Sequence, residues 1–293
     1  MSTAPSTTPV PTDFEQVIAD SEFDFIDFGA GIGGSLRHYE IATGAKGLGV
    51  ELRPHKVAEA QALGRQVVQG SIFEFPDRRM ARFVTIDNVL EHLPTMAEVE
   101  LALTMARNIA SEFIYIRHPA FDDEPYLESL GVRTYWCNWR AHPSHIRLAD
   151  FAEIASRVGL GTMEVHPVGV IRDSDHPSVL PLSAPIDQHD YDEALHGPKP
   201  HVTFDRDVYS AYDIIFHLGP APTLKLTYVG DPLAGITRPR MTLLSPPPAA
   251  TEPASDVTWA LRTLAREGRN TTRRVVRRGA RAARGAIRRI RSS

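Results

Sequence analysis

The sequence has little cysteine and no long apolar run, and each absence excludes a class of protein. Cys137 is the one cysteine among 293 residues, so no disulfide can form within the chain, which fits a reducing compartment. No stretch approaches the roughly 20 apolar residues that a membrane-spanning helix needs. The segment MSTAPSTTPVPT, residues 1–12, has no basic residue and no apolar block, so we expect no secretory signal. A cytoplasmic protein is therefore predicted.

Basic residues are scarce in most of the chain and concentrated near its end. Residues 262–293 hold twelve arginines and one acidic residue, whereas the rest holds 20 basic and 35 acidic residues. Apolar residues recur there at helical spacing and form one narrow stripe: Val276, Ala280, Ala283, Ile287 and Ile290. A basic amphipathic helix of this kind favours an anionic membrane surface. Nucleic acid is the competing partner, and a solvated tail without a dedicated partner is the third interpretation.

Between the two ends, short apolar runs alternate with helix-like stretches. This alternation implies a mostly parallel sheet covered by helices on both faces, so we predict a doubly wound α/β fold with seven strands. The expected strands are 23–28, 46–50, 66–69, 82–86, 112–117, 163–171 and 209–218, and the expected helices are 34–43, 54–63, 95–110 and 147–158.

Composition also divides the chain into parts. We expect residues 1–12 to be disordered and residues 13–244 to form the main domain, with a loop-rich insertion at 172–205. Residues 245–258 contain the Pro-rich run SPPP and are expected to be a linker, and residues 259–293 are expected to form the basic amphipathic helix.

A glycine-rich turn follows the first expected strand, in the order Gly29-Ala30-Gly31-Ile32-Gly33-Gly34. Glycine permits positive φ and leaves no Cβ to block a ligand, and the free N–H groups of the helix that follows favour polar ligand groups. Gly29, Gly31 and Gly33 have the spacing of a methyl-donor site. Gly29, Gly31 and Gly34 have the spacing of a dinucleotide-binding site. Glu51 lies 22 residues after Gly29 at a strand end, where a carboxylate can accept ribose hydroxyls, so it is compatible with both kinds of ligand.

The segment Phe83–Pro94, FVTIDNVLEHLP, separates these two interpretations. Together with the glycine turn and Glu51, it resembles the class I S-adenosylmethionine-dependent methyltransferases, particularly the group with a motif like NVLEHLP after the fourth strand. The resemblance covers roughly residues 20–165 and implies S-adenosylmethionine as the cofactor.

The resemblance also implies which residues contact that cofactor. The turn would hold it through Gly29, Ala30, Gly31 and Gly33. Asp27 would face its amino-acid moiety, and Glu51 would accept both ribose hydroxyls. Asp87, Asn88 and Val89 would line its methionine end. At the end of the third strand the group commonly carries an acid that contacts the adenine. This chain has Ser71 there, followed by Ile72, so a weaker hydrogen bond to the adenine amine is expected.

Histidine is the expected base, because its pKa lies near neutrality. His145, His118 and His142 follow the fifth expected strand and are the candidates, with His145 first. Glu91 and His92 are expected to begin the next helix and organise its loop. The acids Asp122, Asp123 and Glu124 match no tight metal motif, so no metal is predicted.

The acceptor is inferred largely by elimination. Base-amine methyltransferases resemble one another in an Asn/Asp-Pro-Pro-aromatic motif, where this chain has Asp-Asn-Val-Leu. Base-carbon methylation typically uses a cysteine in that region, and Cys137 lies well beyond it. With the basic tail, we predict O-methylation of a glycan or lipid-linked sugar at the cytoplasmic membrane face. A quinone or small-phenol acceptor is the alternative, and a dinucleotide-binding oxidoreductase or a non-catalytic cofactor-binding scaffold would be a different class.

Overall fold

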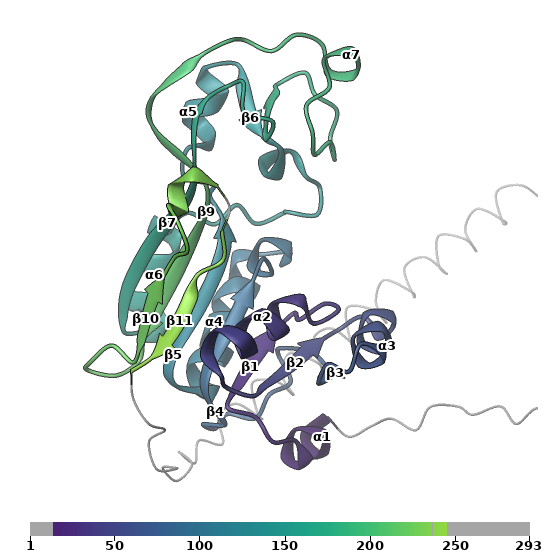
Figure 1. Ribbon diagram of the computed structural model, residues 1–293, viewed down its shortest axis with the longest axis vertical. Coiled ribbons are helices and arrows are strands. Elements are labelled where there is room, and N and C mark those ends of the chain that lie inside the picture. Colours follow the sequence, from purple (N-terminus) through teal and green to yellow (C-terminus); the bar gives the residue numbers. More distant parts are fainter. Residues whose placement is uncertain (1–13, 236, 245–293) are drawn as a thin grey trace, which may run out of the picture. The chain divides into compact units, whose positions relative to one another are not determined.

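The computed structural model describes residues 14–235 and 237–244 (Figure 1). The predictions for residues 1–12, 245–258 and 259–293 lie outside these residues. Within the described part of the chain, no helix is long and apolar enough to cross a membrane.

A seven-stranded sheet forms the centre of the domain, in the order β3-β2-β1-β4-β5-β9-β7. Six of its strands run in the same direction, and β9 alone is antiparallel to both of its neighbours in this sheet, β5 and β7. The strand bounds are β1 Phe25–Phe28, β2 Gly47–Glu51, β3 Val67–Gln69, β4 Ala81–Asp87, β5 Ala110–Pro119, β7 Thr162–Asp173 and β9 Thr203–His217. The predicted doubly wound, mostly parallel sheet of seven strands is therefore confirmed.

Apolar side chains alternate along these strands and create a core on each face of the sheet. On one face, Phe25 and Phe83 pack with helices α2, Gly34–Thr43, and α3, Pro54–Ala62. On the other face, Ile26 and Val84 pack with α1, Phe14–Asp20, α4, Met96–Ile109, and α6, Leu148–Val158. Thr95 caps α4, because its hydroxyl oxygen accepts a hydrogen bond from Glu98 N at 3.2 Å.

A β-hairpin supplements the two helices on the first face. Strands β10, Leu224–Thr227, and β11, Arg240–Leu243, pair antiparallel, and Leu224 and Met241 join the core that contains Phe113 and Tyr115. The 3₁₀ helix η3, Pro232–Ala234, lies in the loop between them. This hairpin was not predicted from the sequence.

Beyond the ends of β7 and β9 lies a group of short elements (Figure 1). It contains α5, Glu124–Ser129, β6, Val132–Thr134, the 3₁₀ helix η2, Tyr135–Asn138, β8, Val179–Pro181, and α7, Glu193–His196. Strand β6 pairs antiparallel with β8, so the segment after β5 and the connection from β7 to β9 form one small layer. A separate apolar cluster around Phe121, Trp136 and Val179 holds it together.

Candidate functional site

The parallel strands end at one edge of the sheet, and the predicted cofactor residues lie along that edge. The sheet reverses its winding between β1 and β4, and such a switch point is where open α/β sheets bind ligands. The glycine turn follows β1, Glu51 ends β2, Ser71 follows β3 and Asp87 ends β4. The strand order thus brings together residues that are far apart in the sequence.

The three alternate glycines of the turn all have positive φ: 66° at Gly29, 57° at Gly31 and 80° at Gly33. A Cβ at Gly29 would lie 2.7 Å from Val89 Cγ2, and one at Gly33 would lie 2.6 Å from Arg65 Cδ. At Gly31 the nearest atom would be Lys56 Nζ, at 3.9 Å. A side chain at Gly29 or Gly33 would therefore force a neighbouring side chain to move, whereas a Cβ at Gly31 would meet only the end of the Lys56 side chain, at an ordinary contact distance.

Asp27 lies beneath this turn and is completely buried. Its two carboxyl oxygens accept hydrogen bonds from Ser35 Oγ at 2.6 Å and from Thr85 Oγ1 at 2.7 Å. Burial raises the pKa of Asp27 to about 7, although both hydroxyls act in the opposite direction. In this structure the carboxyl group ties β1 to β4 and to the first turn of α2, and so fixes the course of the chain through the turn.

Glu51 is also buried, and it contacts the turn from the end of the neighbouring strand β2. Its Oε2 accepts a hydrogen bond from Gly31 N at 3.0 Å, and its Oε1 accepts one from Arg53 N at 2.8 Å. A carboxylate has about four lone-pair sites, so two are left for hydroxyl donors. Ala30 N bonds to Val50 O at 3.1 Å, which holds the turn against the end of β2.

The chain turns sharply after β4. Asn88 has a φ of 53°, unusual for a residue other than glycine, and its amide side chain donates to Asp87 Oδ1 at 2.9 Å. Asp87 Oδ2 accepts hydrogen bonds from Tyr39 Oη at 2.8 Å and from Arg238 Nη1 at 2.5 Å. Val89 lies against Gly29, so this corner and the glycine turn are in direct contact.

The end of β3 matches the expected adenine side only in part. Gly70 N bonds to Glu51 O at 3.1 Å, which places the next residues beside the end of β2. Ser71 Oγ accepts from Phe73 N at 3.3 Å, and Ile72 packs partly buried against the core. Among the described residues, one lone pair and the hydrogen of the Ser71 hydroxyl have no partner, so the oxygen can still accept a hydrogen bond from an amine. The contacts of Ser71 and Ile72 with a cofactor stay predictions.

The three candidate histidines surround one aromatic ring, that of Phe121, just after β5. The ring centroid of Phe121 lies 4.6 Å from that of His145, 5.3 Å from that of His118 and 6.2 Å from that of His142. The structure therefore brings together residues that span 28 positions in the chain. They differ in surroundings, because His118 and His142 are buried and His145 is partly exposed.

His145 has the arrangement expected of a base. Its Nδ1 lies 2.8 Å from Glu124 Oε2, and its side chain is 27% exposed. A carboxylate at Nδ1 fixes the ring and leaves Nε2 free to take a proton. Glu124 was considered from the sequence only as a metal ligand, because no spacing rule links it to a histidine 21 residues away.

His118 and Glu91 form a buried pair next to this group. His118 Nδ1 lies 3.4 Å from Glu91 Oε2, and both side chains are almost completely buried. Burial alone would raise the pKa of Glu91, but His118 outweighs it and holds that pKa below its usual range. Glu91 and His92 were expected to begin the helix after β4. They form instead a separate 3₁₀ helix, η1, Leu90–His92, because α4 starts only after its cap at Thr95.

The aromatic residues after β6 have different surroundings. Trp136 is buried, and its indole N–H donates to Ala120 O at 2.8 Å, so it belongs to the core of the small layer. Tyr135 and Trp139 are partly exposed and pack against His189, from the connection between β7 and β9. These two rings are the ones that a substrate could still contact.

Several residues of this region carried no signal in the sequence. Tyr39, Arg238, Ser35 and Thr85 all act on Asp27 or Asp87, yet each is a polar residue at an unremarkable position. Arg238 comes from the segment before β11, about 150 positions after Asp87. Only the three-dimensional fold shows that this segment reaches the end of β4.

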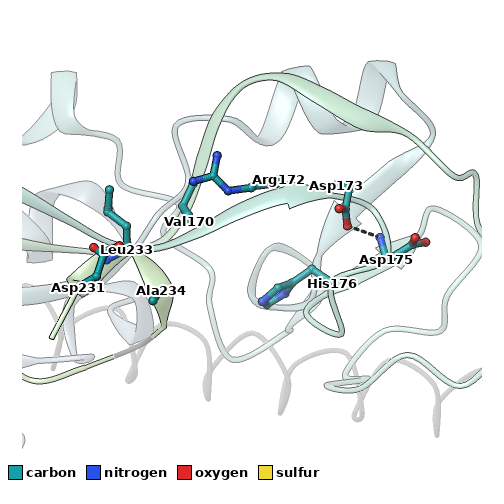
Figure 2. Close-up of a pocket in the computed structure, with 8 residues that line it drawn as sticks. All are labelled: Val170, Arg172, Asp173, Asp175, His176, Asp231, Leu233 and Ala234. Atoms are coloured by element: carbon teal, nitrogen blue, oxygen red, sulfur yellow. Dashed lines mark hydrogen bonds between the residues drawn. The ribbon is translucent and has the colours of Figure 1, made fainter.

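A surface pocket of about 450 Å³ lies elsewhere, between the end of β7 and η3 (Figure 2). Its lining is largely polar and shares no residue with the predicted cofactor or catalytic sets: Val170, Arg172, Asp173, Asp175, His176, Asp231, Leu233 and Ala234. Figure 2 shows Asp173 accepting a hydrogen bond from the Asp175 backbone N–H, at 3.0 Å. This pocket has none of the features that the glycine turn offers to a cofactor.

No family model matches the sequence, and no curated protein matches it. Solved structures with a similar fold include a methyltransferase dependent on S-adenosylmethionine from Archaeoglobus fulgidus, at 15% identity and a TM-score of 0.46 over 66% of this chain and 85% of that one. The YcgJ protein of Bacillus subtilis is similar at 13% identity and a TM-score of 0.44, over 70% and 98% of the two chains.

A third similar structure is the magnesium protoporphyrin IX methyltransferase of Synechocystis with bound S-adenosylmethionine. It is 14% identical, with a TM-score of 0.39, over 69% of this chain and 74% of that one. Because these identities and TM-scores are low, the function has to be inferred from this chain's own residues.

Proposed function

We propose that this chain is a methyltransferase that uses S-adenosylmethionine. The observation that carries the proposal is the glycine turn around Gly31, where a Cβ would meet no close protein atom, at the switch point of the sheet between the strands that end in Glu51 and Asp87. The sequence motif from Asp87 to Pro94 favours a methyl donor over a dinucleotide at this turn.

The residues around Gly31 fit the parts of such a cofactor. Glu51 has lone pairs left for ribose hydroxyls, and Ser71 and Ile72 lie at the neighbouring strand end for the adenine. Asp87, Asn88 and Val89 form the corner for the methionine end, with Arg238 beside them as a cation for a carboxylate. When bound, the cofactor supplies a methyl group that its sulfonium charge has already activated.

The protein's remaining task is to orient an acceptor and to remove its proton. We propose His145 as the base, because Glu124 holds its Nδ1 and its side chain is partly exposed. His118 is too deeply buried to meet an acceptor directly and is better suited to position Glu91. His142 has a pKa lowered by burial, so it is neutral at physiological pH.

For the acceptor, we propose an oxygen of a glycan or lipid-linked sugar at the cytoplasmic membrane face. One support is the basic amphipathic helix expected at residues 259–293. The other is the pair of partly exposed rings of Tyr135 and Trp139, which offer flat apolar surfaces of the kind that sugars stack on. A membrane quinone or small phenol would need the same base and a similar surface.

Calorimetry with S-adenosylmethionine and with NAD, on the full chain, tests the cofactor. We expect S-adenosylmethionine to bind at one site per chain and NAD not to bind. Binding of NAD in preference would replace the proposal with an oxidoreductase. If neither ligand binds, the proposed cofactor is wrong.

The acceptor is tested with S-adenosylmethionine labelled in its methyl group and a fractionated cell extract. We expect the label to enter a lipid-extractable glycan, with a mass increase of one methyl, and the His145→Gln variant to lower its transfer at least about a hundredfold. Label in a small phenol or quinone would select the alternative acceptor.

Pelleting with liposomes tests the membrane partner. We expect liposomes with anionic lipid to pellet the full chain but not a chain that ends at Ser255. Equal pelleting of both would remove the membrane from the proposal, and retention of the full chain by DNA or RNA instead would assign the arginines to nucleic acid.

A further inference from the structure

Three potential metal ligands converge beside the loop after β4. One candidate ligand atom from each of Glu91, His92 and His142 lies within 4.8 Å of those of the other two. Glu91 and His92 are neighbours in η1, whereas His142 lies in the segment before α6, about 50 positions later. Hydrogen bonds from Ser144 to the backbone oxygens of Glu91 and Leu93 join the two segments.

Both histidines are held in the orientation that a metal ligand requires. His92 Nδ1 lies 2.8 Å from Ala141 O, and His142 Nδ1 lies 3.0 Å from Trp136 O. Because a carbonyl oxygen only accepts, each Nδ1 carries the hydrogen and each Nε2 keeps its lone pair. No hydrogen bond to either Nε2 is found among the described residues. Metal-ligating histidines characteristically bond a backbone carbonyl through the other nitrogen in this way.

Glu91 provides a second, independent sign of a missing partner. Its side chain is 1% exposed, and its Oε2 has no hydrogen-bond partner within the described part of the chain. His118 Nδ1 pairs with this oxygen only loosely, at 3.4 Å and without hydrogen-bond geometry, so the carboxylate is incompletely satisfied among the described residues. Buried carboxylate oxygens are normally satisfied, because leaving one without a partner is costly. A cation next to Glu91 would satisfy it.

We propose that Glu91, His92 and His142 bind a divalent transition-metal ion. Two imidazoles and one carboxylate suit zinc, manganese, iron or cobalt, and do not suit magnesium or calcium, which prefer oxygen ligands. In a tetrahedral site with bonds of about 2.1 Å, adjacent ligand atoms are about 3.4 Å apart, so binding an ion would draw the three side chains closer together.

The site has a buried side and an open side. Glu91 and His142 are buried, whereas His92 is exposed at the surface. Three protein ligands and solvent access leave a coordination position for water or for an oxygen of another molecule. His118, behind Glu91, acts as a positioning residue for the carboxylate. The ion would therefore lie beside the histidine group around Phe121, which contacts both His118 and His142. The sequence analysis predicted no metal, because it considered only the acids Asp122, Asp123 and Glu124 as ligands and these match no tight metal motif.

A second group, Glu124, Cys137 and His145, also has ligand atoms within 4.8 Å of one another. It differs in two ways. Glu124 already bonds His145 Nδ1, and Thr134 donates to Cys137 Sγ at 3.1 Å. Burial also raises the pKa of the Cys137 thiol well above its usual range, which disfavours the thiolate that a metal needs. We therefore assign the ion to Glu91, His92 and His142.

The test uses the full chain, freed of metal with a chelator and titrated with Co²⁺, whose visible absorption reports its ligands. We expect one Co²⁺ per chain, a spectrum without a thiolate band, and displacement by Zn²⁺. Zn²⁺ at a hundredfold excess over its Kd should also raise the thermal midpoint by about 5–10 °C.

Variants locate the ion. His92→Gln changes an exposed side chain, and His142→Gln a buried one, and each should weaken Co²⁺ binding by about 100-fold or more. His201→Gln, at an exposed histidine that pairs with Asp175, is the matched control and should bind as the unaltered chain does. Cys137→Ser should leave the spectrum unchanged. Absence of Co²⁺ and Zn²⁺ binding, or binding that survives both His92→Gln and His142→Gln, would overturn the proposal. A thiolate band lost in Cys137→Ser would move the ion to the second group.

Discussion

Asp27→Asn should change how the stability of the domain depends on pH. In the folded chain the pKa of Asp27 rises from 3.8 to about 7, because the carboxyl group is completely buried between Ser35 and Thr85. Between these two values the unfolded chain ionises Asp27 and the folded chain does not. The stability that the protonated group contributes is therefore complete below pH 3.8 and is lost as the pH rises to about 7.

The size of this effect follows from the pKa difference. Each pH unit between the two pKa values lowers the free energy of unfolding by about 1.4 kcal/mol, so a rise from pH 5 to pH 7 lowers it by about 3 kcal/mol. The Asp27→Asn variant keeps a polar side chain of the same size but cannot ionise. From pH 5 to pH 8, the free energy of unfolding of this variant should therefore rise by about 3 kcal/mol relative to that of the unaltered chain. For a domain of this size, this corresponds to roughly 5–10 °C in thermal midpoint.

The assay is thermal unfolding of both chains at pH 5 and at pH 8, followed by circular dichroism. Asp190→Asn, at an exposed aspartate, is the matched control and should show no such difference between the two pH values. The difference in thermal midpoint between Asp27→Asn and the unaltered chain should be larger at pH 8 than at pH 5. If this difference is the same at both pH values, the pKa of Asp27 is not raised by burial.

Three further predictions concern stability and binding. Asp213→Ala leaves the buried Arg117 without the carboxylate that it contacts at 2.7 and 2.8 Å, so unfolding should become easier by about 3–5 kcal/mol, measured by denaturant titration. Thr95→Ala removes the cap of α4 and should cost about 1 kcal/mol of unfolding free energy in the same assay. Glu51→Gln should weaken binding of S-adenosylmethionine by about 10- to 100-fold in calorimetry, and an unchanged affinity would place the ribose elsewhere. The thermal midpoint should also fall, because the amide nitrogen of glutamine cannot accept the hydrogen bond of Gly31 N or Arg53 N that it would face.

The sequence predicted those parts of the fold whose signals are local. Helix α2 begins at Gly34 and ends at Thr43 as expected, since a glycine turn precedes it and Gly44 ends it with a φ of 70°. The seven strands were found because buried strands of a parallel sheet are continuous apolar runs. Residues 172–205 were expected to be loop-rich, and the structure places β8 and α7 there, both too short to leave a periodic pattern.

The parts that were missed depend on contacts between distant residues. The hairpin of β10 and β11 has only four residues in each strand, and its apolar side chains have a use only because Phe113 and Tyr115 lie beneath them. In the same way, the proximity of Glu91 to His142 could not be recognised, because the two residues are close only in the folded chain. His118, His142 and His145 were identified by residue type and position alone. Their common neighbour, Phe121, became visible only in the structure.

The central claim is that the glycine turn around Gly31 holds S-adenosylmethionine. The most direct test is calorimetry of this cofactor with Gly31→Leu and with Gly44→Leu. Both glycines have positive φ, 57° and 70°, so both variants carry similar backbone strain, and at Gly44 a Cβ meets nothing within 4 Å. We predict that Gly31→Leu abolishes binding while Gly44→Leu binds like the unaltered chain. Equal affinity of the two variants, with both folded, would contradict the assignment of this turn to the cofactor.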